Sequence, residues 1–202
     1  MMQYHMGWLD NALQPTADVR GKRLRPIFCL LCCQAAGGDW RAALPAAAAV
    51  ELIHNFSLIH DDIEDDSQRR RGHPTVWSRW GLAQGLNAGD AMWIVARLAA
   101  YQLGDEGYEP ALVLRVVQEL DETCLALCRG QYLDLAFEER HEVSYDEYMR
   151  MISGKTASLI ATSCAVGAML AGADAAQVEA YSDFGHELGL TFQIVDDLLG
   201  IW

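Results

Sequence analysis

The sequence predicts an all-α fold, organised as one domain over residues 1–202, and three observations lead to this prediction. All five prolines lie at or before position 110, and a long run without proline favours helices because proline interrupts them. Short alternating apolar segments joined by Asn-Gly or Asp-Gly turns, which would indicate a β-sheet, do not occur. Mostly apolar side chains recur at steps of three and four, the spacing of one helix face, at Leu112, Val116, Leu120, Thr123 and Leu127.

Apolar periodicity and chain breaks place six helices in order along the sequence. The expected ranges are about 26–36, 43–64, 88–103, 110–138, 145–171 and 175 to the end. Glycine and proline mark the breaks between them, at Gly37-Gly38, Gly72-His73-Pro74, Gly104 to Pro110, and Gly172. The last helix is still in progress at Trp202, without a glycine cap or closing turn. We therefore expect that the chain is a fragment or that further chain follows.

Composition argues against several classes of protein. With 51% hydrophobic and 21% charged residues, the chain can bury a core and is not expected to be disordered. Its formal charge of −13 argues against binding to nucleic acid or to an anionic membrane surface. The most apolar window, residues 46–59, is shorter than a membrane span and contains Glu51 and His54, so stable membrane insertion is not expected.

The six cysteines are expected to be buried thiols. Cys29 and Cys32 have the CxxC spacing of a zinc or disulfide motif, but they lie in the apolar segment FCLLCC. No matching Cys/His pair follows at zinc-finger distance. Small buried thiols are typical of a reducing compartment, and no signal peptide pattern is present, so we expect a cytoplasmic protein.

The strongest chemical signal is an acidic cluster at the end of the helix expected over 43–64. Five carboxylates lie within six positions, in the segment His60-Asp61-Asp62-Ile63-Glu64-Asp65-Asp66. Asp61 and Asp65 project from one helix face because they are four residues apart, with Asp62 beside them. Like charges at this spacing repel, and a hard divalent cation such as Mg²⁺ removes the repulsion. A solvated acidic helix end is the alternative interpretation.

A second pair of carboxylates, Asp196-Asp197, also ends an apolar helical stretch, TFQIVDD. Gln193 precedes Asp196 by about one turn and could hydrogen-bond the same ligand. Two such pairs, each at the end of a long apolar helix, indicate a cavity with metal sites on facing walls.

The few cations are grouped as well. Lys22, Arg23 and Arg25 directly precede or begin a helix with proline near its start, where free backbone N–H groups favour anions. The run Arg69-Arg70-Arg71 follows the acidic cluster, and it could either pair with the aspartates or bind phosphate. Gly154-Lys155-Thr156 adds a further cation and a hydroxyl, although the segment is not a P-loop. Acidic metal sites, basic contacts and an apolar interior suit a substrate with a diphosphate head and an apolar tail.

Five motifs follow one another along the chain: GKRLRP at 21–26, ELIHNFSLIHDDIEDD at 51–66 with RRRG at 69–72, GQYLD at 130–134, GKTASLI at 154–160, and FQIVDD at 192–197. From Gly21 to Trp202, the sequence resembles the trans-isoprenyl diphosphate synthases, also called the polyprenyl synthetase family, and it is similar to the short-chain geranylgeranyl type. The resemblance implies an antiparallel helical bundle around a central apolar cavity, the isoprenoid synthase type, whose last helices lie beyond Trp202.

The resemblance also implies roles for individual residues. It implies that several Mg²⁺ ions, for which Mn²⁺ can substitute, bind at Asp61, Asp62, Asp65 and Asp196. Isopentenyl diphosphate is expected at Lys22, Arg25, His54 and Arg71. The allylic diphosphate is expected at Arg70, Lys155, Thr156 and Gln193. The residues expected to act in catalysis are Asp61, Asp65, Lys155 and Asp196. Taken alone, His54 would be interpreted as a core histidine.

Two further features concern the second metal site and the product. Many members carry DDxxD as the second aspartate motif, and here Gly200 replaces its third aspartate, so Asp197 or a water is expected to compensate. In this family the growing tail runs alongside the helix that ends in the first aspartate motif. Phe56 is large enough to stop that tail, and Ser57 leaves room beside it, which indicates a twenty-carbon geranylgeranyl product, with fifteen-carbon farnesyl next. Ordinary core packing is the alternative interpretation of Phe56.

The implied activity is prenyl transfer from an allylic diphosphate to isopentenyl diphosphate through a Mg²⁺-assisted carbocation, by a homodimer formed through an apolar helix face. A class I terpene cyclase needs only one diphosphate site, whereas GKRLRP with His54 and Arg71 supplies a second. A metal-dependent hydrolase built on His60-Asp61 would need further histidines, and residues 74–140 contain none. A non-catalytic regulatory subunit of a heteromeric synthase is a third alternative, kept open by Gly200.

Overall fold

A computed structural model describes residues 1–16 and 21–201 and confirms the all-α prediction. Its elements are α1 (Met2–His5), α2 (Leu24–Ala35), α3 (Leu44–Glu64), β1 (Arg69–Arg70), β2 (His73–Pro74), α4 (Val76–Trp80), α5 (Leu82–Tyr101), the 3₁₀ helix η1 (Gln102–Gly104), α6 (Pro110–Glu138), α7 (Tyr145–Ile152), the π-helix η2 (Ser153–Ala157), α8 (Ser158–Leu170) and α9 (Ala175–Ile201). The two short strands form one antiparallel hairpin.

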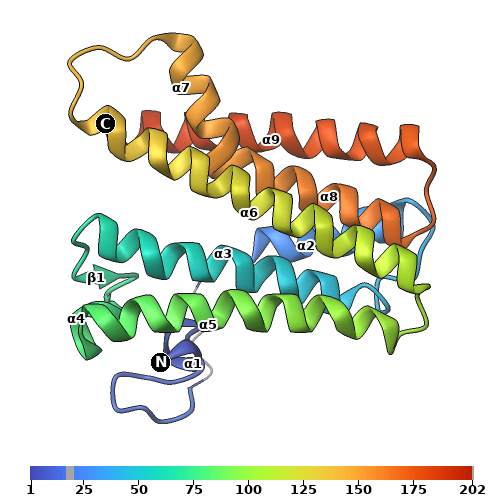
Figure 1. Cartoon of the computed structure of the whole chain (residues 1–202), viewed down its shortest axis with the longest axis horizontal. Helices are drawn as coiled ribbons and strands as arrows, with labels where there is room; N and C mark the ends of the chain where they lie inside the picture. The colour runs from blue at the N-terminus through green and yellow to red at the C-terminus, as the bar shows by residue number, and fades with distance from the viewer. Residues whose placement is uncertain (17–20, 202) are drawn as a thin grey trace.

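The long helices alternate in direction, and this places the ends of three of them together (Figure 1). Helix α3 packs against α5, while α8 packs against both α2 and α9. The C-terminal ends of α3, α6 and α9 lie at the left-hand end of the molecule in Figure 1, together with the β1–β2 hairpin. Both aspartate pairs therefore reach the same end of the bundle.

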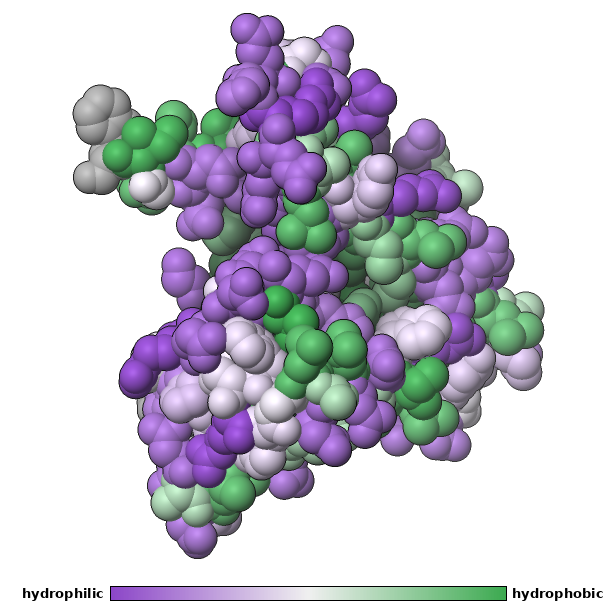
Figure 2. Space-filling view, turned by 60° about the vertical axis from the view of Figure 1, so that its left-hand side comes forward, coloured by the Kyte–Doolittle hydropathy of each residue, from purple (hydrophilic) through white to green (hydrophobic). Residues whose placement is uncertain are grey.

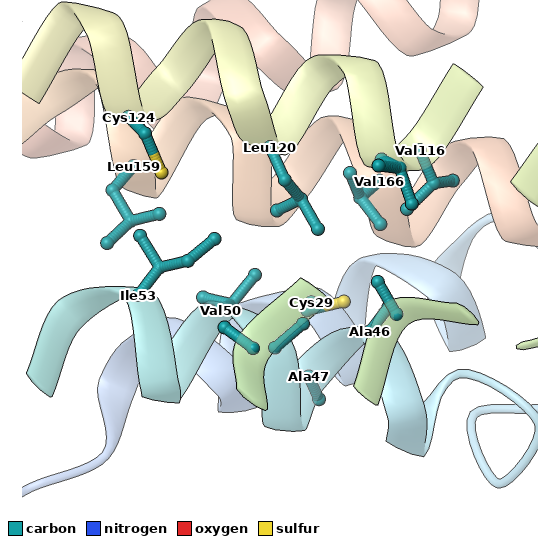
Figure 3. Packing of buried hydrophobic residues seen from close by; sticks show 14 of the residues in the cluster. Cys29, Ala46, Ala47, Val50, Ile53, Val116, Leu120, Cys124, Leu159 and Val166 are labelled. Carbon is teal, nitrogen blue, oxygen red and sulfur yellow. The ribbon is translucent and has the colours of Figure 1, made fainter. Parts of the chain in front are cut away.

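The core lies between α3 and the layer formed by α6 and α8. Figure 3 shows Val50 and Ile53 of α3 pointing toward Leu120 of α6 and Leu159 of α8. Each of these side chains is at most 2% exposed. Burial of a side chain of this size contributes about 1.5–3 kcal/mol, so this packing fixes the distance between the two layers.

Besides α1 and the β1–β2 hairpin, which the sequence did not predict, the structure differs from the sequence prediction at three further places. Helix α5 begins at Leu82 rather than near 88, because Gly85 and Gly89, which are weak helix formers, conceal its first turns in the sequence. Helix α4 was not predicted, and Thr75 caps it by accepting a hydrogen bond from the backbone N–H of Ser78. The helix predicted over 145–171 is divided by η2 into α7 and α8.

The cysteine prediction is confirmed for five of the six residues. All six are free thiols, and Cys29, Cys32, Cys33, Cys124 and Cys164 are buried. The prediction is wrong for Cys128, which is exposed because it lines the cavity described below. None of the helices in residues 1–16 and 21–201 combines the length and apolar content that crossing a membrane requires.

Candidate active site

A cavity of about 980 Å³ opens at the end of the bundle where α3, α6 and α9 terminate. Figure 2 turns this end toward the reader and shows a hollow between the upper and lower parts of the molecule. The cavity is lined by these residues predicted from the sequence: Lys22, Arg25, His54, Phe56, Ser57, Asp61, Arg70, Arg71, Lys155, Thr156, Gln193 and Asp196. Helices and loops distant in sequence thus bring carboxylates, apolar side chains and two cationic groups to one space. The first cationic group is Lys22, Arg23, Arg25 and Arg71, and the second is Arg70 and Lys155.

The first cationic group is presented by strained backbone. Gly21 has φ +99°, and Arg23, the N-cap residue of α2, has φ 49°. Arg71 has φ 50°, and its guanidinium packs on Gly21, where an added Cβ would lie 2.8 Å from Nη1. A left-handed conformation is unfavourable for arginine and persists only where the surroundings impose it, which is common at functional sites. The two segments therefore hold one another in place.

A neutral histidine orients Arg25 within this group. Arg25 Nη1 lies 3.2 Å from His54 Nε2. Burial, together with the charges of Arg25, Arg71 and Arg70, lowers the pKa of His54 well below its usual value. The imidazole is therefore uncharged at neutral pH, and its Nε2 can accept a hydrogen bond from Arg25.

The sequence interpretation missed Glu51, which also lines the cavity. Its Oε1 accepts a hydrogen bond of 3.1 Å from Asn55, and burial raises the pKa of Glu51 while Arg23 and Arg25 lower it. Among the described residues, Arg23 Nε, Arg25 Nε and Glu51 Oε2 are buried without a hydrogen-bond partner. Burial lowers the pKa of Arg25 to about 10, with the charge of Glu51 acting in the opposite direction. The two unpaired guanidinium N–H groups, of Arg23 and Arg25, favour an anionic ligand.

The acidic cluster divides between two faces of α3. Asp61 lines the cavity, 3.3 Å from Lys155 Nζ and 3.4 Å from Arg70 Nη2. Asp62 is only 1% exposed and lies outside the cavity lining, where its Oδ1 accepts a 2.7 Å hydrogen bond from Arg70 Nε. Asp65, one turn beyond Asp61, is exposed and is not among the residues that line the cavity, and burial followed by the charge of Asp61 raises its pKa. Asp61 and Asp65 therefore lie close enough to repel each other.

Lys155 lies between carboxylates of two helices. Its Nζ donates to Asp134 Oδ2 on α6 as well as lying near Asp61 on α3. Burial lowers the pKa of Lys155, but the hydrogen bond and charge of Asp134 and the charge of Asp61 outweigh it, so the pKa lies above its usual value. Asp134 belongs to the GQYLD motif, from which the sequence predicts no role for it. It lies one helical turn after Gly130, which contacts the Lys155 backbone.

Two glycines explain how Lys155 comes so close to α6. A Cβ at Gly130 would overlap the backbone nitrogen of Lys155, and one at Gly154 would lie 2.8 Å from the carbonyl oxygen of Ala126. Only glycine permits this approach of two backbones. The π-turn η2 occurs at the same point, and such turns are frequent at functional sites because the extra residue redirects side chains.

Helix α9 supplies the opposite side of the cavity. Asp196 lines it and is exposed, while Gln193 lines it one turn earlier. Thr156 Oγ1 donates to Gln193 Oε1 over 2.6 Å, and Gln193 Nε2 donates to Asp197 Oδ1 over 2.7 Å. Asp196 and Asp197 thus face different directions, as Asp61 and Asp62 do.

The remaining lining is apolar. Phe56 is 9% exposed and packs edge-on against His60, with ring centroids 5.9 Å apart. Ser57 donates to the carbonyl oxygen of His54, over 2.8 Å. Apolar side chains from three other segments complete this part of the cavity: Leu127, Leu135, Leu159 and Phe192. The cavity can therefore take a charged head near the helix ends and an apolar tail below it.

Comparison with known proteins agrees with this geometry. Residues 6–202 match the polyprenyl synthetase family model. The chain is 45% identical over its whole length to a geranylgeranyl diphosphate synthase of Mycobacterium tuberculosis and to a (2E,6E)-farnesyl diphosphate synthase of Mycobacterium bovis. It spans 57% and 55% of the length of these two relatives.

Solved structures show the same fold. A polyprenyl synthetase from Streptomyces coelicolor A3(2) is 38% identical and superposes with a TM-score of 0.91, covering 99% of this chain and 58% of that one. The resemblance inferred from the five motifs is confirmed. The chain belongs to the polyprenyl synthetase family.

Proposed function

We propose that the protein containing this chain is a trans-prenyltransferase that condenses isopentenyl diphosphate with an allylic diphosphate to give a short-chain prenyl diphosphate. The observation that carries the proposal is one cavity that combines two cationic groups, carboxylates on α3 and α9, and an apolar interior. Relatives named geranylgeranyl and farnesyl diphosphate synthase support products of twenty or fifteen carbons. Two cationic groups, with Lys22, Arg25 and Arg71 in one and Arg70 and Lys155 in the other, favour chain elongation over a terpene cyclase, which needs one diphosphate site.

Mg²⁺, or Mn²⁺ in its place, fits the carboxylates of the cavity. Among the described residues, no three His, Cys, Asp or Glu side chains converge to hold a metal on their own. Mg²⁺ typically takes one or two carboxylates and completes its shell with water and phosphate oxygens, and the mutually repelling Asp61 and Asp65 suit that role. We assign metal binding to Asp61, Asp65 and Asp196, and for Asp62 we propose a different role, holding Arg70. When bound, the metal would neutralise charge on the departing diphosphate.

The side chains of this chain would share the remaining work. Lys22, Arg25 and Arg71 would bind isopentenyl diphosphate, with His54 orienting Arg25. Arg70 and Lys155 would bind the allylic diphosphate and stabilise its charge as the C–O bond breaks. The apolar lining would exclude water from the resulting carbocation. The isopentenyl double bond then attacks this carbon, and a proton leaves to the departing diphosphate.

We also propose a homodimer in the cytoplasm. Helix α5 carries a stripe of exposed apolar side chains spaced at three, four and eight residues: Leu82, Leu86, Ile94, Leu98 and Tyr101. Helix α6, which packs against α5, also carries two exposed apolar side chains, Leu114 and Leu125. An exposed apolar face of this extent supports association with a second copy. Free cysteines that are mostly buried support a reducing compartment.

Removal of divalent metal, or either Asp61→Ala or Asp65→Ala, is expected to lower turnover by about a hundredfold or more, because charge on the diphosphate is no longer neutralised. Mn²⁺ binding followed by electron paramagnetic resonance should weaken in both variants, which tests the site without turnover. Asp183→Ala, an exposed position on α9, serves as the control. Full activity of either variant in the presence of a chelator would refute the metal assignment.

The two diphosphate sites should separate in steady-state kinetics. Arg25→Ala and His54→Ala are expected to raise KM for isopentenyl diphosphate, and Lys155→Ala to raise KM for the allylic partner. Loss of one charged contact costs about 1.5–3 kcal/mol, or roughly ten- to a hundredfold. Arg41→Ala, at a side chain that is 68% exposed, is the control. Equal effects of all three variants on one KM would contradict the assignment of two sites.

Phe56→Ala should lengthen the product by at least one five-carbon unit, because it removes the aromatic ring that limits the cavity beside α3. The variant should also lose about 3–5 kcal/mol of stability, since the side chain is buried. Mass spectrometry of the products gives the length, and thermal unfolding gives the stability. Phe184→Ala, at an exposed position, is the control. A folded variant with unchanged products would place the limit on chain length elsewhere.

Ile94→Glu and Leu98→Glu should convert the protein to a monomer, because each places a charge in the apolar stripe of α5. Sedimentation velocity at micromolar concentration measures the change. Leu31→Glu on α2, which is 54% exposed, should leave the dimer intact. A wild-type protein that sediments as an active monomer would argue against the dimer.

A further inference from the structure

Four polar side chains from three elements form one continuous chain of hydrogen bonds beside the cavity. Tyr148 Oη on α7 donates to Asp197 Oδ2 on α9 over 2.6 Å. The other oxygen of Asp197 accepts from Gln193 Nε2, and Gln193 Oε1 accepts from Thr156 Oγ1 on η2. Gln193 and Thr156 line the cavity, whereas Tyr148 and Asp197 are not among its lining residues.

The direction of this chain follows from donor and acceptor chemistry. An ionised carboxylate can only accept, so Asp197 requires the NH₂ group of Gln193 to face it. The amide oxygen must then face Thr156, and the Thr156 hydroxyl uses its only hydrogen to reach that oxygen. Because that hydrogen points to Gln193, the Thr156 oxygen, which lines the cavity, has only lone pairs left to present to it.

We propose that Asp197 and Tyr148 are positioning residues, which lock the Gln193 amide so that the Thr156 oxygen faces the cavity as an acceptor. This inference rests on the proposed function and extends it. An acceptor-only oxygen repels phosphate oxygens and attracts positive charge, such as the charge that develops on the allylic carbon when its C–O bond breaks. The Thr156 hydroxyl thus acts on the carbocation rather than on the diphosphate.

The surroundings of Tyr148 suit a fixed donor. Helix α7 begins with a capping box between Ser144 and Glu147, which anchors the turn that carries Tyr148. Tyr148 also packs beside a small buried cluster of Ile152, Ala157 and Leu190. Burial and the bond to Asp197 raise the pKa of Tyr148 to about 12, so the hydroxyl keeps its hydrogen at neutral pH.

Both oxygens of Asp197 are engaged in this chain. We therefore assign Asp197 to this chain of hydrogen bonds, and not to the place of the aspartate that Gly200 replaces, which was one of the two compensations expected from the sequence. Its partner in the pair, Asp196, faces the cavity instead.

The decisive variant is Asp197→Asn, because an asparagine must turn an N–H toward one neighbour. If that group faces Gln193, the amide flips, and Thr156 must then donate into the cavity. If the N–H faces Tyr148 instead, the tyrosine hydroxyl can rotate and accept a hydrogen bond from it, and the Gln193 amide need not flip. Because only the first orientation flips the amide, Asp197→Asn should lower kcat by at most about tenfold, the effect typical of a supporting residue, without raising KM for either diphosphate.

The double variant gives the sharpest test. Tyr148→Phe alone leaves the Asp197 carboxylate in place and should lower kcat less than about threefold. Combined with Asp197→Asn, it removes the tyrosine hydroxyl that could accept from the asparagine, and the Gln193 amide must then flip. The double variant should thus lose more activity than the product of the two single effects. Tyr145→Phe on α7 and Asp183→Asn on α9, both exposed, are matched controls, and thermal unfolding checks that every variant folds.

Nuclear magnetic resonance of the Gln193 side-chain amide tests the orientation without turnover. Its N–H signals should shift in Asp197→Asn and shift further in the double variant, while both controls leave them unchanged. Unchanged Gln193 signals and unchanged kcat in the double variant would overturn the proposal, as would weaker Mn²⁺ binding in Asp197→Asn, which would make Asp197 a metal ligand. If the wild-type protein makes no product, the proposed function fails, and the amide signals still decide the orientation.

Discussion

The contact between Gly130 on α6 and Gly154 on η2 determines the geometry of the whole cavity. It brings two backbones together where only glycine fits. The π-turn at this point redirects the side chains of Lys155 and Thr156, which follow Gly154. Lys155 reaches Asp61 and Asp134 on one side, while Thr156 reaches Gln193 on the other. One short segment thereby connects the carboxylates of α3 and α6 with the amide of α9.

Charge in the cavity is balanced by partners that leave donors available. An ammonium has three donors, and Lys155 uses two of them on Asp134 and Asp61, so one remains for a phosphate oxygen. Arg70 uses its Nε on Asp62 and one Nη on Asp61, which directs the rest of its planar fork toward the cavity. The carboxylates therefore do more than repel one another, since they aim the cations that a diphosphate would meet.

The sequence predicted what depends on local spacing and missed what depends on contacts between distant segments. Helical periodicity located the long helices, and the five motifs located nearly all the residues that line the cavity. Glu51 and Asp134 belong to two of the motifs, but their roles follow from contacts with Arg25 and Lys155, which lie far away in the sequence. The hydrogen bond from Tyr148 to Asp197 spans 49 residues and leaves no periodic signal.

The two aspartate pairs divide their work in the same way. Consecutive residues on an α-helix point about 100° apart, and in each pair one aspartate lines the cavity while the other does not. Asp61 and Asp196 face it, while Asp62 holds Arg70 and Asp197 holds Gln193. In each pair the second aspartate thus fixes a side chain that also lines the cavity. At the third position of the second motif stands Gly200, where an added Cβ would meet nothing within 4 Å. Packing does not require glycine there, and the two pairs already place one carboxylate and one anchored polar group on each side.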